Sequence, residues 1–176
     1  MKKRDYVFRK YNGIEIGAKN EGEIMRVKKA LQFVRVKEKR LFTSIQNLEA
    51  VLVRPKGKYN NLLFPKERVY TCEPGTVNES SRSYLGSLFV HEGVHIKQYI
   101  QKRKYKGNDA EQEAYVIQRK FLKMYGTKDE VEWLDLMFTD RWWVKKKTGK
   151  SKENIMRDTD KKLIQFCADY INGKLK

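Results

Sequence analysis

The stretch His91-Glu92-Gly93-Val94-His95 decides the fold expected of this chain. These two histidines are the only ones in the sequence, and they fall in a segment whose apolar residues recur at helical spacing. On a helix, residues four apart lie on the same face, so both imidazoles can reach a single metal ion. Glu92 then lies beside that ion, where it can act on a metal-bound water. The spacing is that of the HExxH motif, which is typical of zinc hydrolases.

The motif predicts a long helix from about residue 79 to residue 105, which Asn78 or Ser80 can cap and which Gly107 ends. Gly93 falls on the packed side of this helix, where a missing side chain permits close approach of another element. At 100° per residue, the two histidines share a stripe with polar and aromatic side chains, and Glu92 lies at the edge of that stripe. The other members of the stripe are Tyr84, Leu88, Gln98 and Tyr99.

A catalytic zinc usually has three protein ligands, and this chain has no third histidine. The third ligand must therefore be a carboxylate or one of the two cysteines, Cys72 and Cys167. The next predicted helix, from Asn108 or Asp109 to about residue 125, offers Glu111 and Glu113 on opposite flanks of its apolar stripe. Periodicity alone does not choose between them. We favour Glu111, because no other charge shares its side of the helix, although it could also cap the helix start.

The segments around these two helices predict an α+β fold. Asn12-Gly13 indicates a hairpin over residues 6–16, and an amphipathic helix is expected over residues 22–42. Short strands at 48–54, 61–64 and 68–72 would complete a small antiparallel sheet, with Glu73-Pro74-Gly75 breaking the run. Thr127 and Glu130 form a capping box for a further helix, and a last helix is expected over residues 153–171.

Composition indicates one folded domain. The chain has 176 residues, of which 40% are hydrophobic, and no linker or repeat divides it. We therefore expect a single domain over residues 1–176, with a core at about 22–126 and a C-terminal helical extension at about 127–176. No secretory signal or membrane-spanning stretch is visible, so a cytoplasmic protein is expected, with signal-independent export as the alternative.

The formal net charge of +17 is the second conspicuous property of the sequence. It invites a nucleic-acid interpretation, but the basic residues are spread along the chain and no known nucleic-acid-binding motif accompanies them. Solvated lysine-rich faces are the favoured explanation, with an acidic partner or substrate as the alternative. The densest basic runs are Lys102-Arg103-Lys104, Lys145-Lys146-Lys147 and Lys150 with Lys152.

The residues around the motif resemble zincin metallopeptidases of the gluzincin type, in which an HExxH helix is followed by a glutamate-bearing helix. The similarity covers about residues 68–126, including 83–90 before the motif and 111–118 after it, where a glutamate-xx-alanine pattern matches Glu111 and Ala114. The resemblance implies a zincin-like fold, with the N-terminal helix and small sheet packed on the two site helices. The chain departs from the best-known gluzincins at Tyr115, where an acidic residue often supports the first histidine. Tyr115 could supply that hydrogen bond or face the substrate.

Together these features predict a Zn²⁺-dependent metallopeptidase acting on a peptide or protein substrate. His91, His95 and Glu111 would hold the metal, and Glu92 would act as the general base. Tyr115, Tyr99 and Tyr84 are alternative donors to the oxyanion, and residues 68–72 are the expected edge strand for aligning a peptide. The rival hypothesis is a basic protein that binds nucleic acid or another polyanion, with a structural or vestigial zinc site.

Overall fold

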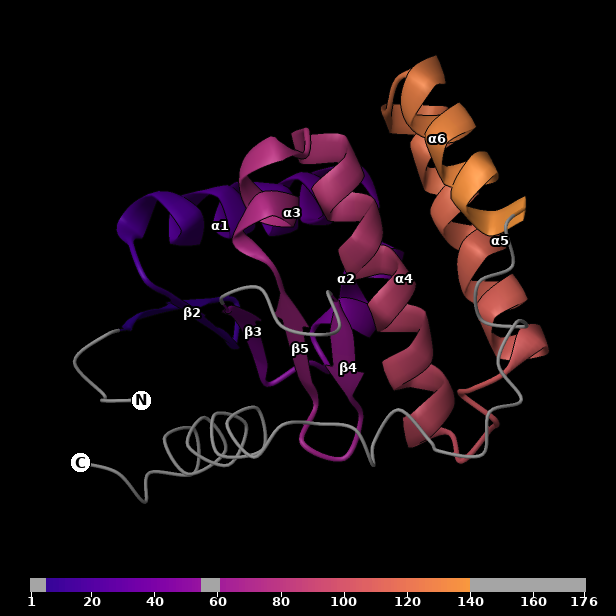
Figure 1. The fold of residues 1–176 in the computed structure, drawn as a ribbon. Helices are drawn as coiled ribbons and strands as arrows, with labels where there is room; N and C mark the ends of the chain where they lie inside the picture. The colour runs from indigo at the N-terminus through magenta and orange to yellow at the C-terminus, as the bar shows by residue number, and fades with distance from the viewer. Residues whose placement is uncertain (1–5, 55–60, 140–176) are drawn as a thin grey trace, which may run out of the picture.

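The computed structural model describes residues 6–54 and 61–139. These residues form an α+β fold in which helices cover one face of a five-stranded sheet (Figure 1). The strands are β1 (Val7–Tyr11), β2 (Ile14–Ala18), β3 (Ala50–Val53), β4 (Leu62–Phe64) and β5 (Val69–Cys72). The helices are α1 (Glu21–Lys37), α2 (Lys39–Ile45), α3 (Pro74–Glu79), α4 (Arg82–Ile100), α5 (Asn108–Tyr125) and α6 (Lys128–Thr139).

The predicted hairpin is present, and the sheet it belongs to is mixed. Asn12 and Gly13 have φ angles of 47° and 92°, the left-handed backbone that a two-residue hairpin turn needs. Strand β2 then pairs with β3, and β3 with β5, in parallel, while the outer pairs β1–β2 and β4–β5 are antiparallel. The prediction of an antiparallel sheet was therefore wrong. Helices α1 and α2 connect β2 to β3, and a crossover of this kind allows parallel pairing.

The strand order corrects the predicted edge. The order is β1-β2-β3-β5-β4, so β5, which covers most of residues 68–72, lies between two neighbours. The edge strand on that side is β4. Residues of β5 are fully buried, whereas all three residues of β4 are only partly buried. A peptide could add to this side of the sheet only along β4.

The amphipathic segment at 22–42 forms two helices instead of one. Helix α1 ends at Lys37, and Glu38 leaves helical geometry with a φ of −142° before α2 begins. The hydroxyl of Tyr125, at the end of α5, lies 3.0 Å from the Glu38 carboxylate and 3.3 Å from the Lys37 carbonyl oxygen. A side chain of a distant helix therefore donates to oxygen atoms at the point where α1 ends.

Helix α4 carries the motif and starts later than predicted, because residues 74–79 form the separate short helix α3 with Pro74 in its first turn. The hydroxyl of Ser81 caps α4 by accepting from the Tyr84 amide, so neither Asn78 nor Ser80 is the cap. The apolar side of α4 lies in the main core, where Tyr70 of β5 meets the Phe89 ring edge-on at 6.0 Å. The motif helix is thus fixed on the sheet.

Gly93 allows α2 to approach α4 closely. A Cβ atom added at Gly93 would lie 3.0 Å from Ile45 Cγ1 and 3.2 Å from the Ile45 backbone nitrogen. We expect Gly93→Val to lower the free energy of unfolding by about 1–3 kcal/mol through overpacking. Urea denaturation checks this, with Gly75→Val as the control, because the nearest atom to a Cβ there is a flexible Glu79 oxygen at 3.6 Å. Equal stability of the two variants would contradict the packing argument.

Helices α5 and α6 start and end close to the predicted residues. Helix α5 starts at Asn108 and is followed by Gly126. The predicted capping box at the start of α6 is confirmed: the Thr127 amide donates to the Glu130 carboxylate at 2.9 Å, and the Glu130 amide donates to the Thr127 hydroxyl at 3.3 Å. The helix predicted over residues 153–171 lies outside the described residues. Within the described ranges, no helix is both long and apolar enough to cross a membrane.

Candidate metal centre

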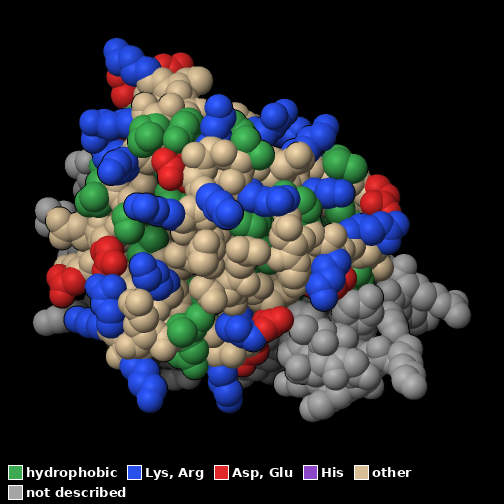
Figure 2. Space-filling model, turned by 180° about the vertical axis from the view of Figure 1, so that it is seen from behind, with side chains coloured by type: hydrophobic (Ala, Val, Ile, Leu, Met, Phe, Trp, Pro, Cys, Tyr) green, Lys and Arg blue, Asp and Glu red, His purple; other side chains and the backbone are tan. Residues whose placement is uncertain are grey.

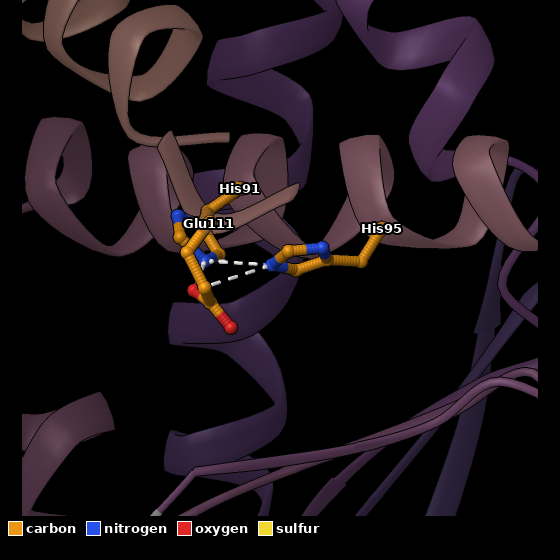
Figure 3. A group of neighbouring side chains, drawn as sticks. All are labelled: His91, His95 and Glu111. Carbon is orange, nitrogen blue, oxygen red and sulfur yellow. Dashed lines mark hydrogen bonds and ion pairs between the residues drawn. The ribbon is translucent and has the colours of Figure 1, made fainter. Parts of the chain in front are cut away.

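Helices α4 and α5 bring His91, His95 and Glu111 together (Figure 3). The two Nε2 atoms lie 3.1 Å apart, and one Glu111 oxygen lies 3.4 Å from His91 Nε2 and 3.6 Å from His95 Nε2. Donor atoms held about 2.0–2.1 Å from a tetrahedral ion lie roughly 3.3 Å from one another. The three side chains therefore have the chemistry and the spacing of a zinc ligand set.

A hydrogen-bond chain fixes the tautomer of His91. The Ser87 hydroxyl donates to the Tyr84 carbonyl oxygen at 2.7 Å, so the Ser87 oxygen is left to accept from the Gln118 amide nitrogen at 3.1 Å. The Gln118 carbonyl oxygen then faces His91 Nδ1 at 3.0 Å, and this contact requires the proton to be on Nδ1. His91 Nε2 therefore carries a lone pair directed at Glu111 and His95.

A second glutamine does the same for His95. The Gln98 amide nitrogen donates to the Glu113 carboxylate at 3.0 Å and lies 3.4 Å from the Ala110 carbonyl oxygen. Because both of these neighbours are acceptors, the Gln98 carbonyl oxygen faces His95 Nδ1, 3.0 Å away. His95 Nδ1 is thus the donor, and its Nε2 also carries a lone pair. Both imidazoles are held in the tautomer that suits metal binding.

The charges at the centre favour a bound cation. Two lone pairs at 3.1 Å and a carboxylate repel one another unless a proton or a metal ion lies among them. Burial alone would raise the pKa of Glu111, but hydrogen bonds from the protonated forms of His91 and His95 lower it well below the usual range. Burial would lower the pKa of His95, and hydrogen bonding with Glu111 raises it instead. The group is therefore arranged around a positive charge.

The structure separates Glu111 from the other candidate third ligands. The Glu113 carboxylate lies 2.6 Å from the Arg103 guanidinium and also accepts from Gln98, so it supports His95 only indirectly. Cys72 is buried in the core, where its thiol donates to the Leu52 carbonyl oxygen and burial raises its pKa to about 12. Cys167 lies outside the described residues.

Glu92 lies on α4 beside the three side chains and toward the sheet. Burial raises the pKa of Glu92, opposed by the nearby His91 and His95. Its charge in turn contributes to the raised pKa of Tyr70 on β5, after burial itself. The Tyr70 hydroxyl is buried without a hydrogen-bond partner among the described residues. A carboxylate in such a site holds a proton more readily than one in water.

Tyr115, the predicted supporting or catalytic residue, is engaged elsewhere. Its hydroxyl donates to Asp135 of α6 at 2.6 Å, and its ring stacks on Phe138 with centroids 3.6 Å apart. Burial and the bond to Asp135 raise the pKa of Tyr115 to about 12. The hydrogen bond to His91 that Tyr115 could have supplied comes from Gln118 instead. The other two candidates for an oxyanion donor also have aromatic partners. Tyr84 forms a hydrogen bond with Trp133, and the Tyr99 ring packs against Tyr105.

The sequence analysis put Gln98 on the stripe of the two histidines without giving it a role, and it did not single out Gln118. The available signal was their spacing: Gln98 lies three residues after His95, and Gln118 lies two turns after Glu111 on the same side of α5. When a glutamine on a helix faces an imidazole, the question is whether its amide nitrogen donates to another acceptor. If it does, its carbonyl oxygen faces the imidazole.

Replacing Gln118 with Leu is expected to weaken zinc binding by about 10–100-fold, because His91 would lose the acceptor that fixes its tautomer. Competition with a chromophoric chelator measures the affinity. The matched control is Gln112→Leu, since Gln112 is an exposed glutamine on the same helix. Equal affinities in the two variants would show that the Gln118 bond does not support the metal.

Comparisons with protein-family models, with curated proteins and with solved structures found no match for this chain.

Proposed function

We propose that this chain is a zinc-dependent metallopeptidase with a zincin-like fold of the gluzincin type. The observation that carries the proposal is the convergence of two imidazole lone pairs from α4 and the Glu111 carboxylate from α5. A structural zinc would normally need four closed protein ligands, whereas three ligands leave a position open for water or substrate. Among the described residues, three such ligands come together here.

In the proposed hydrolysis, the metal ligands and Glu92 have separate roles. When bound, a zinc ion lowers the pKa of a coordinated water toward about 7 and polarises a carbonyl group. Glu92, whose pKa burial raises, is placed to accept the proton of the attacking water and to deliver it to the leaving amine. Gln118 and Gln98 hold His91 and His95 in place, and α4 itself is packed on the sheet.

In this proposal, the substrate binds along the edge of the sheet next to the motif helix. Strand β4 is the outer strand, and its central residue Leu63 pairs with Tyr70 and packs against the main core. Tyr70 in turn packs on Phe89, one turn before Glu92. A peptide that adds to β4 as a further strand would therefore run past the motif helix, with its backbone held by main-chain hydrogen bonds. With a net charge of +17, such a site would favour acidic peptides.

Two measurements on the purified chain test the proposal. Mass spectrometry under native conditions should find one zinc per chain, lost in His95→Ala. A quenched-fluorescent peptide library should then be cleaved by the zinc-loaded protein and protected by a chelator, and zinc should restore cleavage. A chain that takes up no metal even when zinc is added would overturn the proposal. Zinc binding without cleavage of any acidic or neutral library would overturn the peptidase assignment alone.

A further inference from the structure

A basic groove lies on the side of α4 that faces away from the metal centre. It has a volume of about 300 Å³ and runs between α2 and the last turn of α4. On a helix, Lys97 lies about 200° round from His95, so the two side chains leave α4 in nearly opposite directions. The groove and the metal centre are therefore separate sites on opposite sides of one helix. It is lined by six polar or charged side chains and one apolar one: Arg40, Thr43, Ser44, Asn47, Lys97, Gln101 and Ile100.

The groove carries positive charge and no carboxylate among its lining residues. Arg40 and Lys97 stand on its two sides. The pKa of Glu113 is lowered mainly by its hydrogen bonds with Arg103, and the charge of Lys97 adds a smaller effect in the same direction. In the sequence, the exposed Lys39 and Lys102 directly adjoin two of the lining residues, Arg40 and Gln101. Figure 2, seen from behind, shows many more Lys and Arg than Asp and Glu side chains on a face where neither histidine is visible.

The neutral side chains of the groove suit phosphate oxygens. Thr43 and Asn47 donate to carbonyl oxygens of α2 itself, which leaves the Ser44 hydroxyl and the Gln101 amide as donors toward the groove. Contacts to a nucleic-acid backbone are made by this mixture of Arg, Lys, Ser and Gln side chains. No aromatic side chain lines the groove, so it offers no surface on which unpaired bases could stack.

We propose that this groove binds the sugar–phosphate backbone of double-stranded nucleic acid without reading its sequence. Arg40 and Lys97 contact phosphates on either side, and the neighbouring lysines extend the contact along the strand. The site is independent of the proposed peptidase activity, because none of its residues contributes a metal ligand.

Fluorescence anisotropy with a labelled 20-base-pair DNA duplex tests the proposal, using the full chain at several salt concentrations. The wild-type chain should bind, with affinity falling steeply as salt rises from 50 to 200 mM. Arg40→Gln/Lys97→Gln should weaken binding at least tenfold and reduce the slope of log affinity against log salt by about 1–2, since each lost phosphate contact contributes about 0.9.

The control removes the same charge elsewhere. Arg82→Gln/Lys128→Gln removes Arg82 from the opposite end of α4, about 22 Å along the helix from Lys97, and Lys128 from the start of α6. An equal loss of affinity in this control would overturn the groove in favour of diffuse net charge. So would binding to anionic lipid vesicles with no binding to the duplex. His95→Ala should bind the duplex normally, and loss of binding in that folded variant would place the contact at the metal centre.

Discussion

Replacing Glu92 with Gln is expected to lower kcat for peptide hydrolysis by about 10²–10⁴-fold while zinc stays bound. The amide fills the same volume on α4 but cannot accept a proton from the attacking water. None of the three proposed metal ligands is altered, and the hydrogen bonds that Gln98 and Gln118 make to the histidines do not involve Glu92. Peptide binding along β4 should also persist, so KM should change little. Steady-state kinetics together with zinc content check both parts.

The matched control is Glu132→Gln on α6, since Glu132 is an exposed glutamate that makes one weak ion pair with Lys128. It should keep wild-type activity. Full activity in the Glu92→Gln variant would refute the proposed general base. Loss of zinc in that variant would instead mean that Glu92 helps to hold the metal site together, and the kinetic effect could then not be assigned to proton transfer.

Local signals in the sequence predicted the parts of the fold that depend on neighbouring residues. The Asn12-Gly13 turn, the capping box at Thr127 and Glu130, and the start of α5 at Asn108 each follow from a few adjacent side chains and the backbone they favour. The motif helix followed from its apolar period. These features can be predicted without knowledge of any distant contact.

The errors concern contacts between distant segments. Whether β2 and β3 pair in parallel depends on the path of the two helices between them, which the strand sequences do not encode. The end of α1 at Lys37 is contacted by Tyr125, almost ninety residues later in the chain. The position of β5 inside the sheet depends on β4 returning beside it. Periodicity within one segment carries no information on such pairings.

The residues of the site also fall into those that local spacing predicts and those that depend on distant contacts. The spacing of His91 and His95 gave both imidazoles, because a single helix turn fixes their relation. The roles of Gln98 and Gln118 required the positions of Ser87, Ala110 and Glu113, whose oxygen atoms accept from the amide nitrogens of the two glutamines. The resemblance to gluzincins suggested Tyr115 as a hydrogen-bond partner of His91 or a residue facing the substrate, yet its hydroxyl donates to Asp135 of α6. A residue's role in such a site therefore depends on where its second hydrogen bond goes.

The choice between Glu111 and Glu113 gives the second large effect. Glu111→Ala is expected to weaken zinc affinity by well over the 10–100-fold typical of losing a supporting partner, because it would remove a proposed ligand and leave two imidazoles alone. Glu113→Ala should have a smaller effect, within that range, since Glu113 acts on His95 only through Gln98 and is otherwise paired with Arg103. Isothermal titration with zinc, after chelator treatment, measures both variants against the wild-type chain.

Circular dichroism on the same samples checks that the helical content is unchanged, since both residues lie near the start of α5. If Glu113→Ala lost zinc and Glu111→Ala kept it, the ligand assignment would be reversed, and Glu111 would serve only as an acceptor for the protonated form of the two histidines.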